Sequence, residues 1–493
     1  MFPEFSLHYS RLPERFYQRF NPEPVRLPRL IAFNRPLAEE LGFDLAALPS
    51  RDELAQYFAG NTLLPGAEPV AQAYAGHQFG GFVPRLGDGR AVLLGEVVDR
   101  HGRLRDIQLK GAGRTLFSRG GDGRAPLGPV LREYLVSEAM HAMGIPTTRS
   151  LAAVTTGEPV YRETVLPGGV LTRVAASHIR VGTFQYFAAR GDVEGLRILA
   201  DHAIERHYPQ LAELPDEQRY LALFEAVQER QAALVARWMG VGFIHGVMNT
   251  DNTSISGETI DYGPCAFMDA YDPGTVFSSI DQGGRYAYGN QPGIAVWNMA
   301  RLAEALLPLI DADEEQAIAH ATEVLNRFAD RYQAEWLAQM RAKLGLAREA
   351  EGDLELVDAL LQAMQARHAD FTLSFRRLCA CAESPGADAA LLELFRFSEA
   401  IEAWLPRWRQ RLAMEAQPLQ EIAARMRTVN PLYIPRNHLV EQAITAAVEE
   451  DDFRPFETLN EVLALPFEEQ PGRERYAQPA APGEQVMRTF CGT

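Results

Sequence analysis

The sequence contains very little lysine. Only Lys110 and Lys343 are lysines among the 48 Lys and Arg residues, so the chain carries nearly all of its positive charge as arginine. A lysine ammonium is a compact point charge, whereas an arginine guanidinium is a planar fork. A lysine kept in so arginine-rich a chain therefore indicates a site that needs a compact cation, and this directs attention to Lys110.

Cysteine is also scarce, and its spacing excludes the usual cysteine-based frameworks. No C-x-x-C pair occurs among the four cysteines, which are Cys265, Cys379, Cys381 and Cys491. This argues against both a disulfide framework and a structural zinc site.

Long apolar runs and an excess of positive charge are missing as well. No apolar run approaches the roughly 18–20 residues that a membrane span requires. The N-terminus lacks the basic start and apolar run of a secretory signal, so the cytoplasm is the expected compartment. The formal net charge of −17 and a pI of about 5.2 argue against a general nucleic-acid-binding protein, which needs a basic face. A local basic cleft for a nucleotide remains compatible with this charge.

The chain is long enough to require more than one hydrophobic core. It has 493 residues, of which 47% are hydrophobic and 23% are charged, an ordinary composition for a globular protein. Because single cores stop growing at roughly 250–300 residues, two or more lobes are expected.

Glycine is concentrated in one part of the chain. Twelve of the 39 glycines lie between Gly76 and Arg124, which indicates close approach of the backbone to a ligand. Residues 91–98 and 104–110 predict two strands joined by a turn. The segment Gly87-Asp88-Gly89-Arg90 is a tight loop that enters this hairpin, Lys110 closes it, and residues 111–124 form a flexible basic loop.

The rest of the chain is predicted to be mainly helical. Apolar residues at helical spacing predict a helix over 127–143, which carries Glu133 and Glu138, and three short strands are expected at 150–155, 160–165 and 170–175. From about residue 179 the pattern predicts helices at 224–238, 296–309, 314–340, 354–366 and 390–414. The acidic, proline-rich stretch 468–483 is predicted to be poorly packed.

Residues 245–261 concentrate side chains that bind hard cations. Asn249, Asp251 and Asn252 lie close together, and Asp261 opens an Asp-Tyr-Gly triplet. An Asn followed by an Asp-aromatic-Gly triplet is how kinase-type folds hold Mg²⁺ against the phosphates of a nucleotide. The alternative is a polar loop stabilised by Asx turns.

The order of these parts is that of a protein kinase. Lys110 neutralises phosphate oxygens, and a carboxylate on the following helix holds its ammonium in place. Gly87 and Gly89 let backbone N–H groups approach phosphate. In such an arrangement Asn252 and Asp261 would hold the metal, and Arg90, Arg173 and Arg180 would bind the remaining phosphate charge.

Each part also has a plainer interpretation. The glycine loop is compatible with an ordinary hairpin turn, Lys110 with a strand end at the surface, and Glu133 with a solvated helical residue. For His245 the plainer interpretation, a hydrogen-bonded core histidine, is the better one.

The loop also departs from the kinase pattern. If His245 and Asn252 are placed on the loop H-R-D-x-x-x-x-N, Val247 stands where the catalytic base belongs. The nearest carboxylate is Asp251. Two interpretations stay open: an inactive kinase, or a nucleotide that lies differently, with Asp251 as the base.

Five long segments resemble the selenoprotein O family, the YdiU-type proteins. They are AYAGHQFGGFVPRLGDGRAVLLGE, DIQLKGAGRTLFSRGGDGRA, LREYLVSEAMHAMGIPTTRS, HGVMNTDNTSISGETIDYGPCAFMD and NPLYIPRNHL. The resemblance implies a kinase-like fold that binds ATP in a flipped orientation and transfers AMP, not phosphate, to protein hydroxyl groups. A flipped nucleotide brings the α-phosphate to the reaction centre, so the base need not stand at position 247.

The resemblance also implies roles for individual residues. Asp251 resembles the proton acceptor, and Asn252 and Asp261 resemble the Mg²⁺ ligands. Lys110 resembles the nucleotide-binding lysine, with Glu133 as its ion-pair partner and Glu138 as the alternative. Eight further residues of this chain resemble the family's remaining nucleotide contacts: Gly87, Gly89, Arg90, Asp122, Gly123, Arg173, Arg180 and Asp261.

The family is named for a selenocysteine near the C-terminus, where this chain has the ordinary Cys491. Cys265 lies four residues after Asp261. We hypothesise a reversible Cys265–Cys491 disulfide that ties the tail over the cleft and lowers activity. The alternative is two unrelated thiols.

Taken together, these patterns predict an α+β, kinase-like protein of two lobes. Residues 1–69 form an N-terminal extension, 70–178 a small β-rich N-lobe, 179–420 a helical C-lobe, and 421–493 a C-terminal extension. The expected reaction is Mg²⁺- or Mn²⁺-dependent transfer of AMP from ATP, or of UMP from UTP, to Ser, Thr or Tyr hydroxyls of partner proteins. The alternatives are a phosphotransferase that uses the γ-phosphate and a non-catalytic nucleotide-binding scaffold. No nucleic acid or membrane partner is expected.

Overall fold

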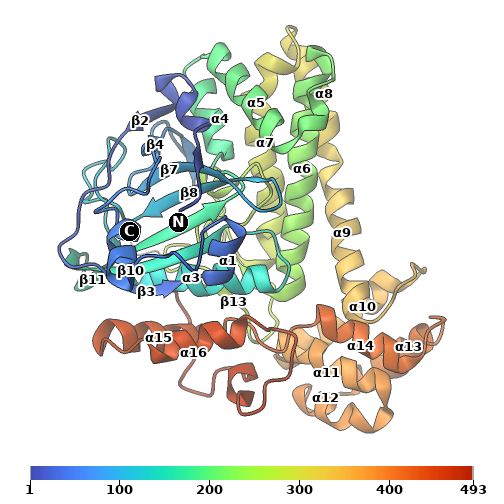
Figure 1. Cartoon of the computed structure of the whole chain (residues 1–493). Helices are drawn as coiled ribbons and strands as arrows, with labels where there is room; N and C mark the ends of the chain where they lie inside the picture. Colours follow the sequence, from blue (N-terminus) through green and yellow to red (C-terminus); the bar gives the residue numbers. More distant parts are fainter. Residues whose placement is uncertain (1, 491–493) are drawn as a thin grey trace.

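The computed structural model describes residues 2–490, apart from the side chain of residue 217. One large antiparallel sheet is built from the first part of the chain, and helices make up most of the rest (Figure 1). The predicted α+β class is confirmed.

The sheet has the strand order β2-β4-β7-β8-β11-β10-β3, and its neighbours are antiparallel. The strands are β2 (Tyr17–Arg19), β3 (Arg29–Phe33), β4 (Val70–Gln72), β7 (Ala91–Val98), β8 (Leu104–Lys110), β10 (Arg149–Tyr161) and β11 (Val165–Ala175). Two short strands, β1 (Phe5–Ser6) and β9 (Ala125–Pro126), pair with β7 and β11. The predicted strands 91–98 and 104–110 are confirmed as β7 and β8. Because β1, β2 and β3 belong to segment 1–69, this segment forms part of the sheet.

The prediction of three short strands after residue 150 is wrong. The segment forms one long hairpin, β10–β11, whose turn falls within the predicted strand 160–165. The pairing shifts register between Thr155 and Pro159, so it continues past Gly157 and Pro159. Glycine and proline in a strand pattern resemble strand breaks, but they also mark bulges of this kind.

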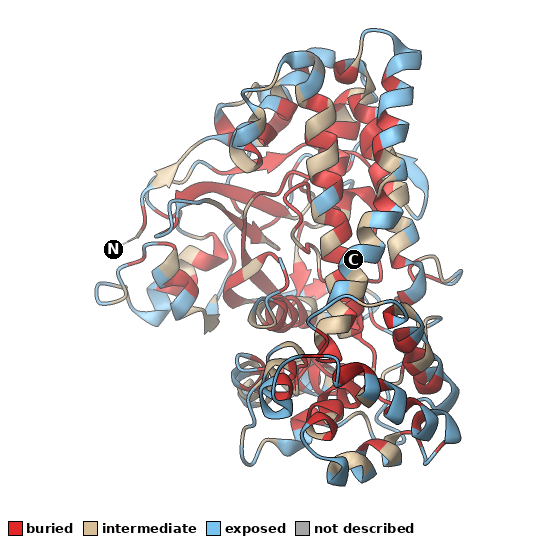
Figure 2. Ribbon diagram, turned by 90° about the vertical axis from the view of Figure 1, so that its right-hand side faces the viewer, coloured by how far each residue is buried: buried red, intermediate tan, exposed pale blue. Residues whose placement is uncertain are grey.

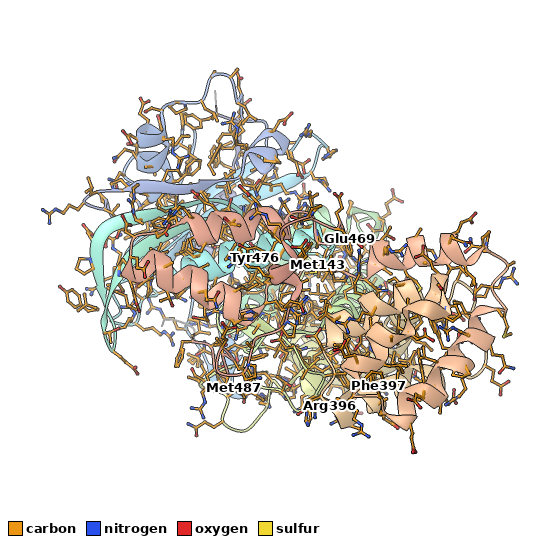
Figure 3. All side chains as sticks on the ribbon, turned by 90° about the horizontal axis from the view of Figure 1, so that it is seen from below. Met143, Arg396, Phe397, Glu469, Tyr476 and Met487 are labelled. Carbon is orange, nitrogen blue, oxygen red and sulfur yellow. The ribbon has the colours of Figure 1, made fainter. Side chains whose placement is uncertain are left out.

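Helices cover both faces of the sheet. One face packs against α1 (Arg35–Glu40) and α2 (Arg51–Ala59). The other face packs against α3 (Leu127–Ala142), which is in turn covered by α15 (Asn437–Glu449) and α16 (Arg454–Leu463). In the view from below, α15 and α16 lie across this side of the sheet (Figure 3). The predicted helix 127–143 is confirmed as α3, and its position between the sheet and α15–α16 fixes the side chains that it presents to the cleft.

The remaining helices form two groups (Figure 1). The first contains α4 (Val181–Ala188), α5 (Val193–His207), α6 (Asp216–Val241), α7 (Gln291–Ile310), α8 (Glu314–Asn326) and α9 (Phe328–Lys343). The second contains α10 (Asp353–Arg367), α11 (Phe371–Glu383), α12 (Asp388–Leu394), α13 (Glu399–Leu412) and α14 (Leu419–Val429). Buried residues concentrate where the helices face one another and on the strands of the sheet (Figure 2). Helix α14 continues across the predicted boundary at residue 420.

Two predicted helices are each divided. The segment 314–340 forms α8 and α9, separated at Arg327, and 390–414 forms α12 and α13. Both Arg327 and Arg331 bind Glu225 of α6, at 2.9 and 2.7 Å, so the break lets α9 run along α6. Between α12 and α13, Arg396 and Phe397 have positive φ angles, which no helix accommodates.

The stretch predicted to be poorly packed is anchored. It contains the short 3₁₀ helix η7 (Glu474–Ala477), in which Tyr476 and Ala477 are buried. Arg436 donates a hydrogen bond of 2.8 Å to the carbonyl of Ala477. Tyr476 packs in the same core as α3, α15 and α16.

One helix meets the length and composition of a membrane span, although Arg301 and Glu304 interrupt its apolar residues. An 18-residue window within residues 288–310, the segment that contains α7, has a mean hydropathy of 1.3, but half of that window is buried within the fold. The helix packs against α4, α6 and α8. Burial among neighbouring helices is a common reason for apolar composition in a core helix.

Candidate functional site

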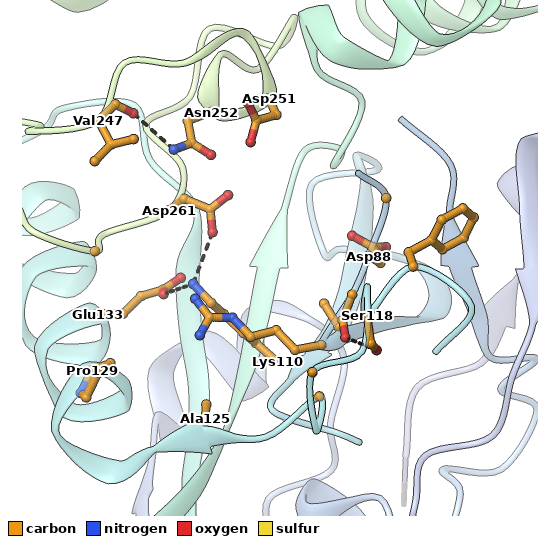
Figure 4. Close-up of a pocket in the computed structure, with 18 of the residues that line it drawn as sticks. Asp88, Lys110, Ser118, Ala125, Pro129, Glu133, Val247, Asp251, Asn252 and Asp261 are labelled. Carbon is orange, nitrogen blue, oxygen red and sulfur yellow. Dashed lines mark hydrogen bonds and ion pairs between the residues drawn. The ribbon is translucent and has the colours of Figure 1, made fainter. Parts of the chain in front are cut away.

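A single cleft brings the predicted site residues together. It has a volume of about 740 Å³ and lies between the sheet with α3 and the loop 245–264 (Figure 4). The predicted nucleotide, metal and base residues that line it are Gly87, Gly89, Arg90, Lys110, Asp122, Gly123, Glu133, Arg173, Arg180, Asp251, Asn252 and Asp261. They come from positions as far apart as 87 and 261, so this convergence is produced by the fold.

A charged cluster occupies the floor of the cleft (Figure 4). The ammonium Nζ of Lys110, at the end of β8, lies 2.6 Å from Glu133 Oε2 on α3 and 3.0 Å from Asp261 Oδ1. Arg173 on β11 binds the same two carboxylates, at 2.5 and 2.7 Å. Arg180 lies 3.3 Å from Asp261 Oδ2. Three cations against two carboxylates leave the cluster with a net charge of +1, which suits it to phosphate.

The cations keep both carboxylates ionised. Burial raises the pKa of Glu133, but Arg173 and Lys110 outweigh it and hold that pKa below its ordinary value. For Asp261, burial is likewise outweighed by Arg173, Lys110 and Arg180, which hold its pKa well below the ordinary value. Asp261 has φ +64°, a left-handed conformation that Asp adopts more readily than most residues.

Of the two candidate carboxylates on α3, Glu133 pairs with Lys110. Glu138 faces elsewhere and binds Arg149 Nη2 at 2.7 Å, with a further bond of 2.8 Å from the Ser150 N–H. Glu138 therefore connects α3 to the start of β10.

The glycine positions allow close packing of the loops around the cleft. A Cβ added at Gly87, where φ is +69°, would lie 2.3 Å from the Phe117 ring. One added at Gly123, where φ is +68°, would lie 2.0 Å from the carbonyl oxygen of Gly113. Gly87 therefore lets the 111–124 loop pack against the 87–90 loop, and Gly123 lets the two ends of the 111–124 loop pack against each other.

Asp122 lies beside Gly123 and is held by an arginine from the β10–β11 turn. Arg162 binds its carboxylate through two bonds of 2.8 and 3.0 Å. The hydrogen bond from Arg162 lowers the pKa of Asp122, so this residue is ionised and oriented at the edge of the cleft.

The loop after α6 holds His245 in the core. Its Nε2 lies 2.8 Å from the carbonyl oxygen of Ile260, and its ring is buried. This is the hydrogen-bonded core histidine that the sequence favoured. Val247, the residue that the kinase pattern of the sequence would assign to the base position, is apolar and lines the cleft.

Besides Asp261, this loop offers a second carboxylate to the cleft, that of Asp251. It lies in the 3₁₀ turn η4 (Thr250–Asn252) and is 7% exposed. Its Oδ2 accepts a bond of 3.2 Å from Gln78 Nε2, whereas its Oδ1 has no hydrogen-bond partner among residues 2–490. Burial raises the pKa of Asp251 to about 6. A carboxylate of this kind is a competent proton acceptor near neutral pH.

The neighbouring oxygens fit a hard cation. Asn252 donates through Nδ2 to the Val247 carbonyl at 3.0 Å, which leaves its side-chain oxygen as an available ligand (Figure 4). Asp261 supplies carboxylate oxygens beside it. Oxygen donors of this type suit Mg²⁺ or Mn²⁺, which commonly take few protein ligands and complete their shell with phosphate and water. Within the described residues, no group of three or more His, Cys, Asp or Glu side chains forms a separate metal site.

Sequence reasoning missed several residues that shape the cleft. Asp88 is buried, and its Oδ2 accepts bonds from the Gln72 N–H at 3.0 Å and from Gln108 Nε2 at 3.4 Å. Burial raises the pKa of Asp88 to about 6. Its position between the two predicted glycines was an available signal. No signal in the sequence indicated the contacts of Gln78 and Arg162, because their partners, Asp251 and Asp122, are distant in the chain.

Of the hypothesised Cys265–Cys491 pair, only Cys265 belongs to the residues that the structure describes. Cys265 is buried directly after the cleft loop, whereas Cys491 lies outside the residues that the structure describes. The described tail reaches the neighbouring residue, since Thr489 Oγ1 donates a bond of 2.6 Å to the Pro264 carbonyl.

Comparison with known proteins identifies the family. Residues 3–464 match the family model described as "Protein adenylyltransferase SelO". The chain is 62% identical over 489 residues to the protein nucleotidyltransferase YdiU of Rhizobium rhizogenes (strain K84), covering 99% of this chain and 97% of that protein. It is 63% identical over 489 residues to the protein of the same name from Bradyrhizobium sp. (strain BTAi1), covering 99% of each. The chain therefore belongs to the SelO family and is an enzyme, a protein nucleotidyltransferase.

Proposed function

We propose that this enzyme transfers AMP from ATP to Ser, Thr or Tyr hydroxyl groups of other proteins and releases pyrophosphate. UTP is an alternative donor in the same cleft. The observation that carries the proposal is the placement of Asp251, a buried carboxylate with one oxygen unpartnered among residues 2–490, in a cleft that the apolar Val247 also lines.

The proposed chemistry is an in-line displacement at the α-phosphorus. Asp251 accepts the proton of the acceptor hydroxyl as the oxygen forms a bond to the α-phosphorus. The bond between that phosphorus and the oxygen bridging to the β-phosphate breaks, and pyrophosphate leaves with the bonding electrons. The product is a phosphodiester between AMP and the protein side chain.

The charged cluster supplies the electrostatic part of this reaction. Lys110, Arg173 and Arg180 hold nucleotide phosphate charge, and the net charge of +1 persists while Glu133 and Asp261 are ionised. Arg90, Asp122, Gly87, Gly89 and Gly123 complete the predicted nucleotide contacts along the rim of the cleft.

A divalent cation belongs to this proposal. Asn252 and Asp261 would hold Mg²⁺ or Mn²⁺, which neutralises developing charge on the phosphates. The hydrogen bond from Asn252 Nδ2 to the Val247 carbonyl orients the Asn252 side-chain oxygen before any metal binds.

The arrangement is also proposed to be that of a two-lobed kinase. The Lys110–Glu133 pair on β8 and α3 and the Asn252/Asp261 pair on the facing loop correspond to the kinase parts in type and order. The proposed lobes are residues 70–178 and 179–420, with the extensions outside them, and the proposed compartment is the cytoplasm.

The test is mass spectrometry of protein substrates after incubation with ATP and Mg²⁺ or Mn²⁺. Asp251→Ala is the test variant, and Asp44→Asn, at an exposed loop position, is the matched control. An AMP adduct formed by the wild type and the control, and abolished by Asp251→Ala with ATP binding retained, supports the proposal. A phosphate adduct would instead assign a kinase, and ATP binding without any adduct would assign a scaffold.

A further inference from the structure

A small hairpin stands at the mouth of the cleft, separate from the large sheet. Its strands are β5 (Gly76–Gln78) and β6 (Gly81–Val83), and Gln78 and Phe79 line the cleft. The two turn residues, Phe79 and Gly80, have φ angles of +52° and +86°. Positive φ at both positions is typical of a type I′ turn, which sets the hydrogen-bond register of the strands.

One side of the hairpin is fixed to the loop that carries Asp251. The His77 N–H donates to Thr250 Oγ1 at 2.7 Å, and the Phe79 N–H donates to Asn249 Oδ1 at 3.0 Å. Gln78 binds the Asp251 carboxylate itself. The position of the hairpin is therefore coupled to that of the candidate base.

The other side, the outer edge of β6, is open. In a two-residue hairpin the pair Gln78–Gly81 is hydrogen bonded and the next pair, His77–Phe82, is not. The backbone N–H and C=O of Phe82 therefore point away from β5, and among the described residues no further strand pairs with β6. The side chain of Phe82 is 41% exposed. An unpaired strand edge beside exposed aromatic rings is a template for an added strand.

The surroundings of this edge combine aromatic rings with a cation. The His77 ring lies 4.9 Å from the Phe82 ring and 5.2 Å from the Trp297 ring. Arg285 stacks over Trp297 at 4.9 Å, and no carboxylate of the described chain forms an ion pair with it. Its Nε is buried without a hydrogen-bond partner in that part of the chain. Because Arg285 forms no ion pair within the described chain, its guanidinium is available to bind an acidic side chain of a partner.

We propose that the outer edge of β6 binds an extended segment of the acceptor protein as a third strand; this rests on the proposed function. Strands in a sheet lie about 4.8 Å apart, so the added strand runs about 10 Å from β5, whose Gly76 lies against the Asp251 carboxylate. An extended chain covers that distance in about three residues. The modified hydroxyl therefore lies about three residues from the paired ones, with an apolar side chain over Phe82 and an acidic one toward Arg285.

The first test removes the backbone donor. Phe82→Pro deletes the outward N–H but leaves the two inward-bonded pairs of the hairpin in place, and proline is tolerated on edge strands. Phe82→Ala keeps the N–H and removes only the ring. The control is Phe397→Ala, another exposed phenylalanine, which lies on the α12–α13 connection away from the sheet (Figure 3). The probe is a library of nonapeptides with a central Ser, Thr or Tyr, labelled from α-labelled ATP.

Phe82→Pro is expected to lower kcat/KM for the peptides about tenfold, through KM, with an unchanged Kd for ATP, because one backbone hydrogen bond to the peptide is lost. Phe82→Ala is expected to have a smaller effect and Phe397→Ala none. Wild-type labelling by Phe82→Pro would overturn the docking proposal alone. If the wild type labels neither peptides nor proteins, the proposed function fails and the docking proposal falls with it.

A second measurement uses the wild type and does not depend on a variant folding. Hydrogen exchange of the Phe82 amide is measured in the presence of α,β-methylene ATP, with and without a peptide that the library assay shows to be a substrate. We expect about tenfold slower exchange at Phe82 when the peptide is bound. Unchanged exchange at a saturating peptide concentration would contradict strand addition at this edge.

Discussion

The raised pKa of Asp251 makes the enzyme's pH dependence a test of its role. Because the base must be unprotonated, transfer should rise with pH and level off above about 6, the pKa to which burial raises this carboxyl. The measurement is kcat/KM between pH 5 and 8. Asp88, in the same cleft, also has a pKa of about 6, so Asp88→Asn is the control. If the rise of kcat/KM with pH disappears in Asp88→Asn, the profile reports Asp88, and Asp251 is not the base.

Glu133 and Glu138 form a matched pair on one helix. Glu133→Gln removes one of the two carboxylates that Lys110 and Arg173 share and leaves Asp261 alone to balance three cations; breaking such a buried pair costs about 3 kcal/mol or more. We expect Glu133→Gln to weaken ATP binding at least about tenfold, since Lys110 loses its orientation, and to lower Tm.

Glu138→Gln breaks the contact with Arg149 and should lower Tm while leaving the Kd for ATP unchanged. Calorimetric titration with ATP, together with thermal unfolding, separates the two effects. Equal loss of ATP affinity in both variants would mean that the pairing with Lys110 has no specific role.

At the scale of elements, the loops around the cleft depend on glycine at positions where both the φ angle and the space exclude a side chain. Gly123→Ala combines a left-handed conformation with a clash against the Gly113 carbonyl, so it should cost about 2–4 kcal/mol and abolish ATP binding. Gly102→Ala, in the β7–β8 turn, has φ +76° and open space around it, so it should cost about 1 kcal/mol and leave binding intact. Urea unfolding and ATP titration measure both effects, and equal effects would show that the clash is unimportant.

Element prediction succeeded where the pattern was local and failed where pairing was distant. The strands β7 and β8 and the helix α3 have the predicted bounds to within one residue, since each follows from its own periodicity. The hairpin β10–β11 was divided wrongly because its bulge is stabilised by the partner strand, not by the residues at the break. Helices α8 and α9 were joined because the break at Arg327 depends on Glu225 of α6.

At the scale of the whole molecule, Arg436 connects three distant parts of the chain. Its fully buried guanidinium binds Asp269, just after β13 (Ala266–Phe267), and Asp370, the N-cap of α11, both at 2.6 Å. It also binds the carbonyl of Ala477 in the tail. Arg436→Met leaves two carboxylates without their partner and should cost about 3–5 kcal/mol.

Thermal unfolding of Arg436→Met, compared with Arg454→Met, provides the measurement. Arg454 pairs with Asp452 on the exposed surface, so its replacement should leave Tm unchanged. Limited proteolysis should also cut the tail of Arg436→Met first. An unchanged Tm for Arg436→Met would show that the tail and α15 are held by apolar packing alone.

The sequence by itself determined the family, the order of the parts and many of the residues that line the cleft, but not Asp88, Gln78 or Arg162. This was possible because the glycine loops, Lys110, the 245–261 loop and Asp261 are short segments whose chemistry is written in adjacent residues. The sequence also placed Glu133 and Glu138 on the helix that is α3, but could not say which of them pairs with Lys110. Periodicity shows which face of a helix a residue lies on, but not which residue of another segment it contacts.

Only the tertiary structure decided which charges meet, which carboxylate is buried and which backbone edge is open. The ion pairs of Lys110, Arg173 and Asp261 join β8, β11 and the facing loop, and the pKa of Asp251 follows from burial beside Gly76 and Gln78. These properties depend on distances between segments far apart in the chain, and on water excluded by their packing, which no local pattern of residues contains.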